Sequence, residues 1–329
     1  MIMTPLVCLV ALAAAPSSSH SQPDHHADAY LPTSSRQVWG FSHGIRLAIF
    51  PNAISGPGDG GPRGLLRIGY PILPDGGSNL INFIAVEPTV NGRKGFSELE
   101  RSADGNPGKV VQFTGARREK IGKGPDRLIL EFDVERFENG AHVRLEAAFR
   151  SDRPNEVELR AYAEPDSAPM QECVLTATMG NYERLRRIWL KNGSVDSKIL
   201  YPDYTGDGFA SDHFFPLDLL ARRKDGSVIA PCAPDEPDPR EAQSRLPAGT
   251  FWRYPGVRVT QYWRAPRGSF SPDLTLRVNA RRVYWGSNLP LPGGIAFENI
   301  ELRDHFRSGQ PFIFGVSTEP AEDLTKDRG

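Results

Sequence analysis

The sequence predicts an all-β fold, a single large antiparallel β-sandwich with about a dozen or more long strands and very little helix. Three observations predict this class. Long stretches alternate apolar and polar residues with a period of two, which is the pattern of a strand with one buried face. Glycine and proline, 32 and 29 of the 329 residues, cluster between these stretches, where they mark turns. No fixed-period repeat divides the chain, which argues against a propeller or solenoid and favours two sheets packed face to face.

The first residues of the chain predict export. Residues 5–15 are apolar and uncharged but too short to span a bilayer, which takes about 20 apolar residues. Small residues suited to cleavage follow, so we predict a signal peptide over residues 1–21 and a flexible polar leader over residues 22–35. The alternative is a buried N-terminal helix. Export implies a secreted or periplasmic protein, and we expect no transmembrane segment.

The most regular alternation lies between residues 126 and 165. Apolar residues there occupy every second position in three runs, which are separated by the turn dipeptide Asn139-Gly140 and by a turn at residues 152–155. This arrangement predicts an antiparallel meander of three strands, each about ten residues long. The runs are residues 126–137, 141–151 and 156–165.

Shorter alternating runs on both sides of the meander extend the sandwich over one domain, residues 36–318. Residues 182–190 fit a helix and a strand equally well. We expect a long surface loop at the acidic, proline-rich residues 233–249 and a disordered tail over residues 319–329. The shorter predicted strands are residues 36–41, 44–50, 109–115, 256–265, 273–285, 294–302 and 311–316.

Composition and missing motifs argue against several classes of protein. The 39 basic and 40 acidic side chains nearly cancel, which argues against a general binder of nucleic acid or of anionic membranes. The chain lacks G-x-S-x-G, a phosphate-binding loop, H-E-x-x-H and a dinucleotide fingerprint, so α/β serine hydrolases, nucleotide enzymes and zincins are disfavoured. We expect no cofactor and no metal. After signal removal only Cys173 and Cys232 remain, and they form either one disulfide or two buried thiols.

The richest polar loop spans residues 201–215 and supplies the first catalytic candidates. His213 can serve as a general acid or base beside a carboxylate, with Tyr204 as its partner. Asp207 is a candidate for contact with the substrate. It also falls in an incomplete calcium-loop pattern, whose twelfth position is Phe214 instead of Glu. The alternative is a turn in which Asp and Gly have only conformational roles.

Glu298 is the other catalytic candidate. Alternation places it on the apolar face of its strand with Ile300 and Leu302, where an unpaired carboxylate is costly and tends to have a raised pKa. The alternative is a β-bulge near Asn299 that returns the side chain to solvent. His43, beside a glycine in a predicted strand or turn, is a further candidate near the substrate.

Aromatic and arginine side chains interleave between residues 251 and 285. Rings can stack on the C–H faces of a sugar, and guanidinium groups bind carboxylate or sulfate. Trp263 alternates with the buried face of its strand, whereas Tyr262 and Arg264 point the other way. We therefore predict that Tyr262, Arg264 and Trp252 bind the sugar. The alternative is that the rings fill the core of the sandwich.

A stretch rich in glycine, proline and asparagine, residues 64–100, is expected to cross between the sheets or to form the rim of a cleft. Glu87, Glu98 and Glu100 are carboxylates that could face this cleft. Paired carboxylates are what glycoside hydrolysis needs, but their separation depends on the fold.

At the level of architecture, residues 36–318 are similar to the large supersandwiches of galactose mutarotases and of several polysaccharide lyases. The resemblance lies in the length, the export signal and the long antiparallel strands, and it identifies no catalytic residue. It implies an exported carbohydrate-active enzyme that uses acid/base chemistry on a sugar or acidic glycan, either epimerase- or mutarotase-like or polysaccharide lyase-like. The alternative is a non-catalytic glycan-binding or cell-envelope β-sandwich protein. The expected partner is a sugar or polysaccharide, not a nucleic acid.

Overall fold

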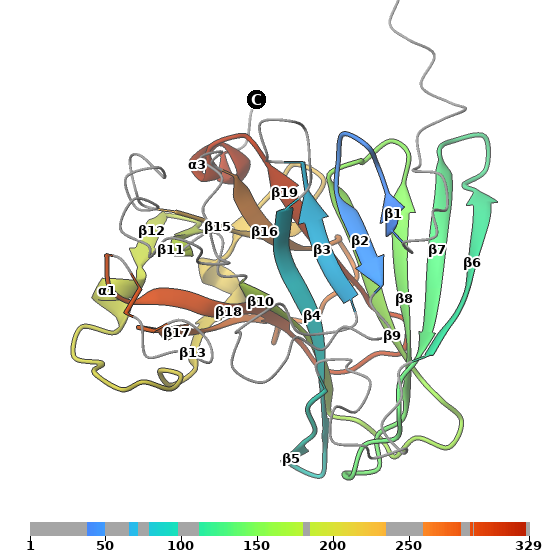
Figure 1. Cartoon of the computed structure of the whole chain (residues 1–329), viewed down its shortest axis with the longest axis horizontal. Helices are drawn as coiled ribbons and strands as arrows, with labels where there is room; N and C mark the ends of the chain where they lie inside the picture. Colours follow the sequence, from blue (N-terminus) through green and yellow to red (C-terminus); the bar gives the residue numbers. More distant parts are fainter. Residues whose placement is uncertain are drawn as a thin grey trace, which may run out of the picture.

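The structure, a computed structural model, describes residues 38–49, 66–71, 79–97, 112–179, 185–234, 259–283, 290–291 and 293–326. These residues form two large antiparallel sheets packed face to face, so the predicted all-β sandwich is confirmed (Figure 1). The predicted signal peptide and leader, Trp252 and most of the predicted surface loop lie outside the described residues. No described helix is long and apolar enough to cross a membrane. The helical segments are α1 (Ser197–Leu200), the 3-10 helix η1 (Leu217–Leu219) and α3 (Ala321–Thr325).

Nine described strands form the first sheet: β1 (Val38–Gly40), β2 (Arg46–Ile49), β3 (Leu66–Tyr70), β4 (Asn79–Val90), β5 (Arg93–Lys94), β10 (Glu172–Met179), β13 (His213–Pro216), β17 (Thr275–Arg281) and β18 (Ala296–Arg303). They pair in the order β1-β2-β3-β4-β10-β18-β17-β13, and β5 pairs with β4. The chain order and the spatial order therefore differ. Strands β4, β10 and β18, which are far apart in the sequence, lie side by side (Figure 1).

Ten described strands form the second sheet: β6 (Gln112–Lys120), β7 (Asp126–Asp133), β8 (Val143–Arg150), β9 (Glu156–Ala163), β11 (Leu185–Leu190), β12 (Gly193–Asp196), β14 (Ala221–Arg222), β15 (Val228–Pro234), β16 (Thr260–Ala265) and β19 (Pro311–Ser317). They pair in the order β12-β11-β15-β16-β19-β9-β8-β7-β6, and β14 pairs with β15. Strands β7, β8 and β9 are the predicted meander.

The core lies between the sheets and contains the apolar faces that alternation predicted. In the meander, Leu130 and Phe149 are fully buried. On β16, Trp263 packs edge-on against Phe314, with ring centroids 5.4 Å apart. The Trp263 Nε1 donates a hydrogen bond of 2.6 Å to the carbonyl oxygen of Ile300 on β18. This bond joins the two sheets through the core.

The predicted turn at Asn139-Gly140 is present, and Gly140 has the positive φ of +90° that favours glycine. The strands of the meander are eight residues long, because the chain leaves the sheet after Asp133 and forms a longer loop than a tight hairpin. The Asn139 side-chain nitrogen donates to the carbonyl oxygens of Pro88 and Arg93, at 3.0 and 2.9 Å. The loop is thereby attached to the β4–β5 hairpin of the other sheet.

Three segments resolve or correct the sequence predictions. Residues 185–190, where helix and strand fitted equally, form strand β11. A disordered tail was expected from residue 319, but residues 321–325 form α3, because Leu324 is buried in a small cluster with Ile229 and Tyr262. Cys173 on β10 and Cys232 on β15 are buried thiols in different sheets and form no disulfide.

Candidate active site

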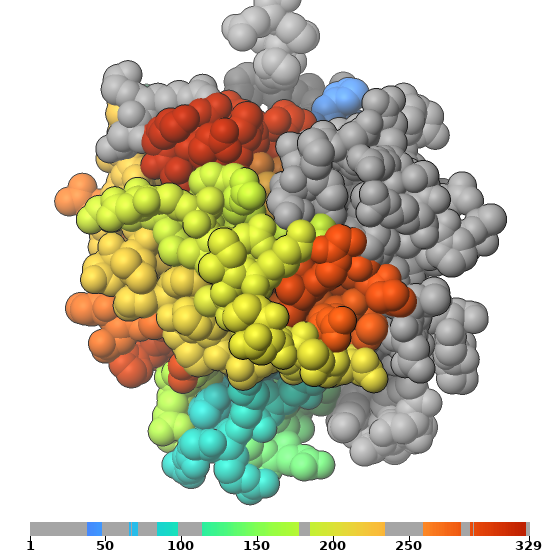
Figure 2. Space-filling view, turned by 90° about the vertical axis from the view of Figure 1, so that its left-hand side faces the viewer, coloured from blue at the N-terminus to red at the C-terminus, as the bar shows by residue number. Residues whose placement is uncertain are grey.

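The polar loop that supplied the first catalytic candidates was predicted over residues 201–215; its first part, residues 201–212, lies against β17, and its last residues belong to β13. The Tyr201 hydroxyl donates to the Val278 carbonyl oxygen at 3.1 Å, and the Ala210 amide donates to the Ala280 carbonyl oxygen at 2.8 Å. On the face shown in Figure 2, the yellow residues of this region lie beside orange residues from the end of β17 and the start of β18. These contacts carry the chain into the edge strand β13 and fix the position of His213.

His213 begins β13, and its ring lies beside that of Phe215, with centroids 4.7 Å apart. Tyr204 is half-buried and packs against the main core. No interaction among the described residues joins His213 or Tyr204 to Glu298. The catalytic roles predicted for these three residues are not supported by a direct contact between them, and they remain predictions.

Glu298 is the extra residue of a β-bulge, because Asn279 pairs with Asn299 and Ala280 pairs with Phe297. The bulge that the sequence offered as the alternative is present, yet it does not return the carboxylate to solvent, since Glu298 is only 7% exposed. Burial raises its pKa to about 7, and the positive charge of Arg281 partly opposes this shift.

Arg281 also connects Glu298 to the polar loop. Its Nη2 donates to the Asp207 carbonyl oxygen at 3.2 Å, and its guanidinium lies 5.0 Å from the centre of the Phe209 ring. Two of the predicted site residues, Asp207 and Glu298, are therefore neighbours of the same arginine. The Asp207 carboxylate itself is exposed.

The structure shows a second acidic cluster on the outward face of the first sheet that the sequence did not predict as a unit. The guanidinium of Arg277 on β17 binds Glu301 on β18 through Nε and Glu87 on β4 through Nη2. Its Nη1 lies 3.8 Å from the carboxylate of Asp212, which immediately precedes β13. One arginine thus holds three carboxylates. We call these four residues, Glu87, Asp212, Arg277 and Glu301, the carboxylate cluster.

Glu301 is the deepest member of the carboxylate cluster and is completely buried. Burial raises its pKa to about 8, an effect that Arg277 opposes and the negative charge of Glu87 reinforces. Its Oε2 has no hydrogen-bond partner among the described residues. Burial therefore favours the protonated form of this carboxyl group.

A cavity of about 760 Å³ opens above the carboxylate cluster, and Glu87, Asp212 and Arg277 line it. Lys94 also faces this cavity, and its Nζ lies 3.2 Å from Glu87 Oε2. The ring of Phe214 is 41% exposed beside it. The cavity thus offers carboxylates, cations and an aromatic face together, which are the groups that bind sugar hydroxyls and sugar rings. The remaining charged or titratable lining residues are Glu172, Arg303 and His305.

The predicted sugar-binding residues Tyr262 and Arg264 lie elsewhere, on the outward face of the second sheet. Both point away from the core, as alternation predicted, while Trp263 between them points inward. Arg264 binds both carboxylate oxygens of Glu156, at 3.0 and 2.6 Å, and the Tyr262 hydroxyl donates to the same carboxylate at 3.2 Å. The structure does not bring these residues together with His213 or Glu298, and their role as sugar contacts remains a prediction.

The remaining predicted site residue, His43, makes no described contact with either site. His43 is exposed in the turn between β1 and β2. Within the described part of the chain, no group of three or more His, Cys, Asp and Glu side chains is arranged to hold a metal ion, and this includes the incomplete calcium loop.

No protein-family model matches the sequence, and a search of the curated proteins finds none that resembles it.

Proposed function

We propose that this chain is an exported carbohydrate-active enzyme that uses acid/base chemistry on a sugar or acidic glycan, with Glu87 and Asp212 exchanging the protons. The observation that supports the proposal is the carboxylate cluster beneath the cavity of about 760 Å³. A large cavity with converging polar groups is the feature that most often marks an active site.

Glu87 and Asp212 are the two members of the carboxylate cluster that combine access to the cavity with proximity to Arg277. In sugar epimerisation at the anomeric carbon, one group takes the proton of the anomeric hydroxyl while another protonates the ring oxygen. In β-elimination, one group takes the proton beside the carboxylate while another protonates the leaving glycosidic oxygen. Both reactions need a proton acceptor and a proton donor facing one substrate, as two carboxyl groups can provide.

Glu301 has a supporting role in this proposal. It is buried behind Arg277 and does not line the cavity, and burial raises its pKa to about 8. Glu87 and Asp212 are therefore the members of the carboxylate cluster that can meet a substrate. Phe214 and Lys94 provide contacts for a sugar ring and for hydroxyl or carboxylate oxygens. His213 and Glu298 lie on the same sheet, Tyr204 lies in the loop that precedes β13, and all three remain alternative candidates for the proton-exchanging groups.

The experiment that tests the proposal is an activity screen of the full chain against neutral and acidic oligosaccharides. Polarimetry detects interconversion of anomers, and ultraviolet absorbance detects the unsaturated product of β-elimination. We expect turnover of at least one substrate, and we expect Asp212→Asn and Glu87→Gln each to lower kcat by roughly 100-fold or more, the usual contribution of a general acid or base.

The matched control is Glu131→Gln, which neutralises a carboxylate of similar exposure to Asp212, 3.3 Å from Arg117 on the opposite sheet. It should retain full turnover. Unchanged kcat in both cluster variants, with turnover abolished by Glu298→Gln, would move the chemistry to the neighbourhood of Arg281. Saccharide binding without turnover by any form would support the alternative, a non-catalytic glycan-binding protein.

A further inference from the structure

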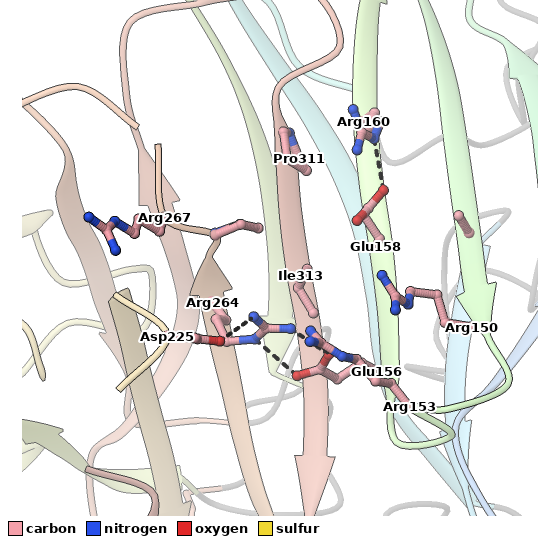
Figure 3. Close-up of a pocket in the computed structure, with 12 residues that line it drawn as sticks. Arg150, Arg153, Glu156, Glu158, Arg160, Asp225, Arg264, Arg267, Pro311 and Ile313 are labelled. Atoms are coloured by element: carbon pink, nitrogen blue, oxygen red, sulfur yellow. Dashed lines mark hydrogen bonds and ion pairs between the residues drawn. The ribbon is translucent and has the colours of Figure 1, made fainter. Parts of the chain in front are cut away.

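A groove runs over the outward face of the second sheet, on the side of the sandwich opposite the carboxylate cluster. It consists of two adjoining cavities of about 340 and 360 Å³, which share Arg153, Glu156, Asp225 and Arg264 in their walls. Figure 3 shows these side chains gathered over β9, β19 and β16, with Ile313 of β19 between them. We call this feature the arginine groove.

The floor of the arginine groove is fixed by a buried ion pair. Arg264 is only 4% exposed, and its bidentate contact with Glu156 is supported by the Tyr262 hydroxyl. Tyr262 in turn lies over Gly315 of the adjacent strand, where a Cβ atom would be 2.1 Å from the ring. These contacts hold Arg264 and Glu156 in one geometry, so the floor is preformed.

The walls of the arginine groove carry an excess of positive charge. Six arginines and three carboxylates line the two cavities, which leaves three positive charges in excess, and no lysine is among them. Asp152 and Glu158 engage two of the arginines, Arg150 and Arg160. The remaining arginines outside the floor are Arg153, Arg223 and Arg267.

These three arginines are available to a ligand. Arg223 and Arg267 are exposed, and neither makes an ion pair with another described residue. Arg153 is 41% exposed and only 3.5 Å from Glu156, which Arg264 already binds. Arg267 lies against Gly226, where a Cβ atom would come within 2.7 Å of the arginine Cδ, so the hairpin that carries Arg223 and Asp225 also borders Arg267.

The mixture of charges indicates the chemistry of the ligand. A guanidinium fork matches the two oxygens of a carboxylate, and Asp225 and Glu158 accept hydrogen bonds from hydroxyl groups. The same two carboxylates repel a densely charged phosphate chain. We propose that the arginine groove binds an acidic saccharide, with Arg153, Arg223 and Arg267 on its carboxylates and Asp225 and Glu158 on its hydroxyls. This inference does not depend on the proposed function, because the two sites lie on opposite sheets.

The test is calorimetric titration of the full chain with uronate oligomers, built from galacturonate, mannuronate or glucuronate, and with the methyl esters of the same oligomers. The esters keep the ring and the linkage but lack the charge. We expect at least one acid form to bind and its ester to bind about tenfold or more weakly, since a hydrogen bond to a charged group contributes about 1.5–3 kcal/mol and 1.4 kcal/mol is tenfold in affinity.

The variant Arg223→Gln/Arg267→Gln should weaken binding of the acid form by roughly tenfold or more. The matched control, Arg136→Gln, removes one exposed arginine from the meander loop and should leave the affinity unchanged. Equal binding of acid and ester forms, or unchanged affinity in the double variant, would overturn the proposal. Tighter binding of a single-stranded RNA oligomer than of any uronate oligomer would also overturn it.

A further variant separates this inference from the proposed function. Asp212→Asn should leave uronate binding at the arginine groove unchanged, even where it abolishes turnover. If Asp212→Asn abolishes uronate binding and the double arginine variant does not, the acidic saccharide binds in the cavity above the carboxylate cluster. The arginine groove proposal then fails while the proposed function stands.

Discussion

Each outward face of the sandwich has ion pairs around one central charged side chain, and the sign of that central charge differs between the two faces. On the first sheet one arginine, Arg277, holds three carboxylates, whereas on the second sheet Glu156 lies between Arg264 and Arg153. Carboxylates therefore outnumber the guanidinium group at the centre of the first face, whereas arginines outnumber carboxylates along the walls of the arginine groove on the second. Burial of a carboxylate favours its protonated form, and exposed arginines bind anions. This difference suggests proton chemistry for one face and anion binding for the other.

The largest expected effect compares the two central arginines. Arg277→Met should lower the free energy of unfolding at pH 7 by about 3–5 kcal/mol, because it removes the hydrogen-bonded guanidinium group from two buried carboxyl groups, Glu301 and Glu87, and only Glu87 keeps another cation, Lys94. Arg264→Met should cost less, about 1–3 kcal/mol, because Glu156 keeps Arg153 and the Tyr262 hydroxyl as partners. Urea unfolding followed by circular dichroism measures both, and equal losses would contradict the described asymmetry.

The second prediction concerns pH. The folded-state pKa of Glu298 is raised from 4.5 to about 7, so the folded protein keeps a proton that the unfolded chain has released. This contribution to stability is fully present below pH 4.5 and is lost as the pH rises through 7. In the unsubstituted protein, this loss lowers the unfolding free energy by about 3 kcal/mol across that range. The Glu298→Gln variant should not show this decrease.

Unfolding in urea at several pH values measures this effect. Glu131→Gln is again the matched control, because it removes a carboxylate from the other sheet, and its pH dependence should follow that of the unsubstituted protein. A Glu298→Gln curve that runs parallel to the unsubstituted protein from acidic to neutral pH would show that Glu298 is not the buried titrating group. Glu301, whose pKa of about 8 is also raised by burial, should still lower stability at higher pH in this variant.

The smallest expected effect concerns the floor of the arginine groove. Tyr262→Phe should lower stability by about 1 kcal/mol, because the hydroxyl of the buried Tyr262 side chain donates to Glu156 and helps to hold that carboxylate against Arg264. Tyr162→Phe removes a similar bond, from a hydroxyl to Glu146 at 2.9 Å, but on a more exposed part of the same sheet. Thermal unfolding should show the larger loss for Tyr262→Phe. The reverse order would indicate that the hydroxyl is not needed to hold Glu156.

Strand positions and side-chain directions could be predicted from the sequence where one face of a strand is buried and the other is exposed to solvent. Alternation correctly placed the meander and β17, and it placed Trp263 inward with Tyr262 and Arg264 outward. Strand β10 was not predicted, because consecutive residues such as Val174 and Leu175 are both buried and leave no alternation to detect.

The candidate site was less accessible to sequence reasoning for two physical reasons. Arg277 and Glu87 are 190 positions apart, and they meet because β4, β10, β18 and β17 lie in this order in one sheet, so that both side chains reach across the same face. The order in which distant strands pair cannot be predicted from the local alternation of apolar and polar residues. Glu298 illustrates the second reason: a single bulge changes which way a side chain points, and the burial of that side chain then depends on its three-dimensional surroundings.

The hydrogen bond from Trp263 Nε1 to the Ile300 carbonyl has a mechanical consequence. Apolar contacts between two sheets tolerate small sliding movements, but a directional bond from a side chain of one sheet to the backbone of the other does not. Sliding one sheet past the other by one residue would break this hydrogen bond and leave the buried indole N–H without an acceptor. The bond therefore holds the two layers against shear at this position. Its two residues, Trp263 and Ile300, are the chain neighbours of Arg264 on one outward face and of Glu301 on the other.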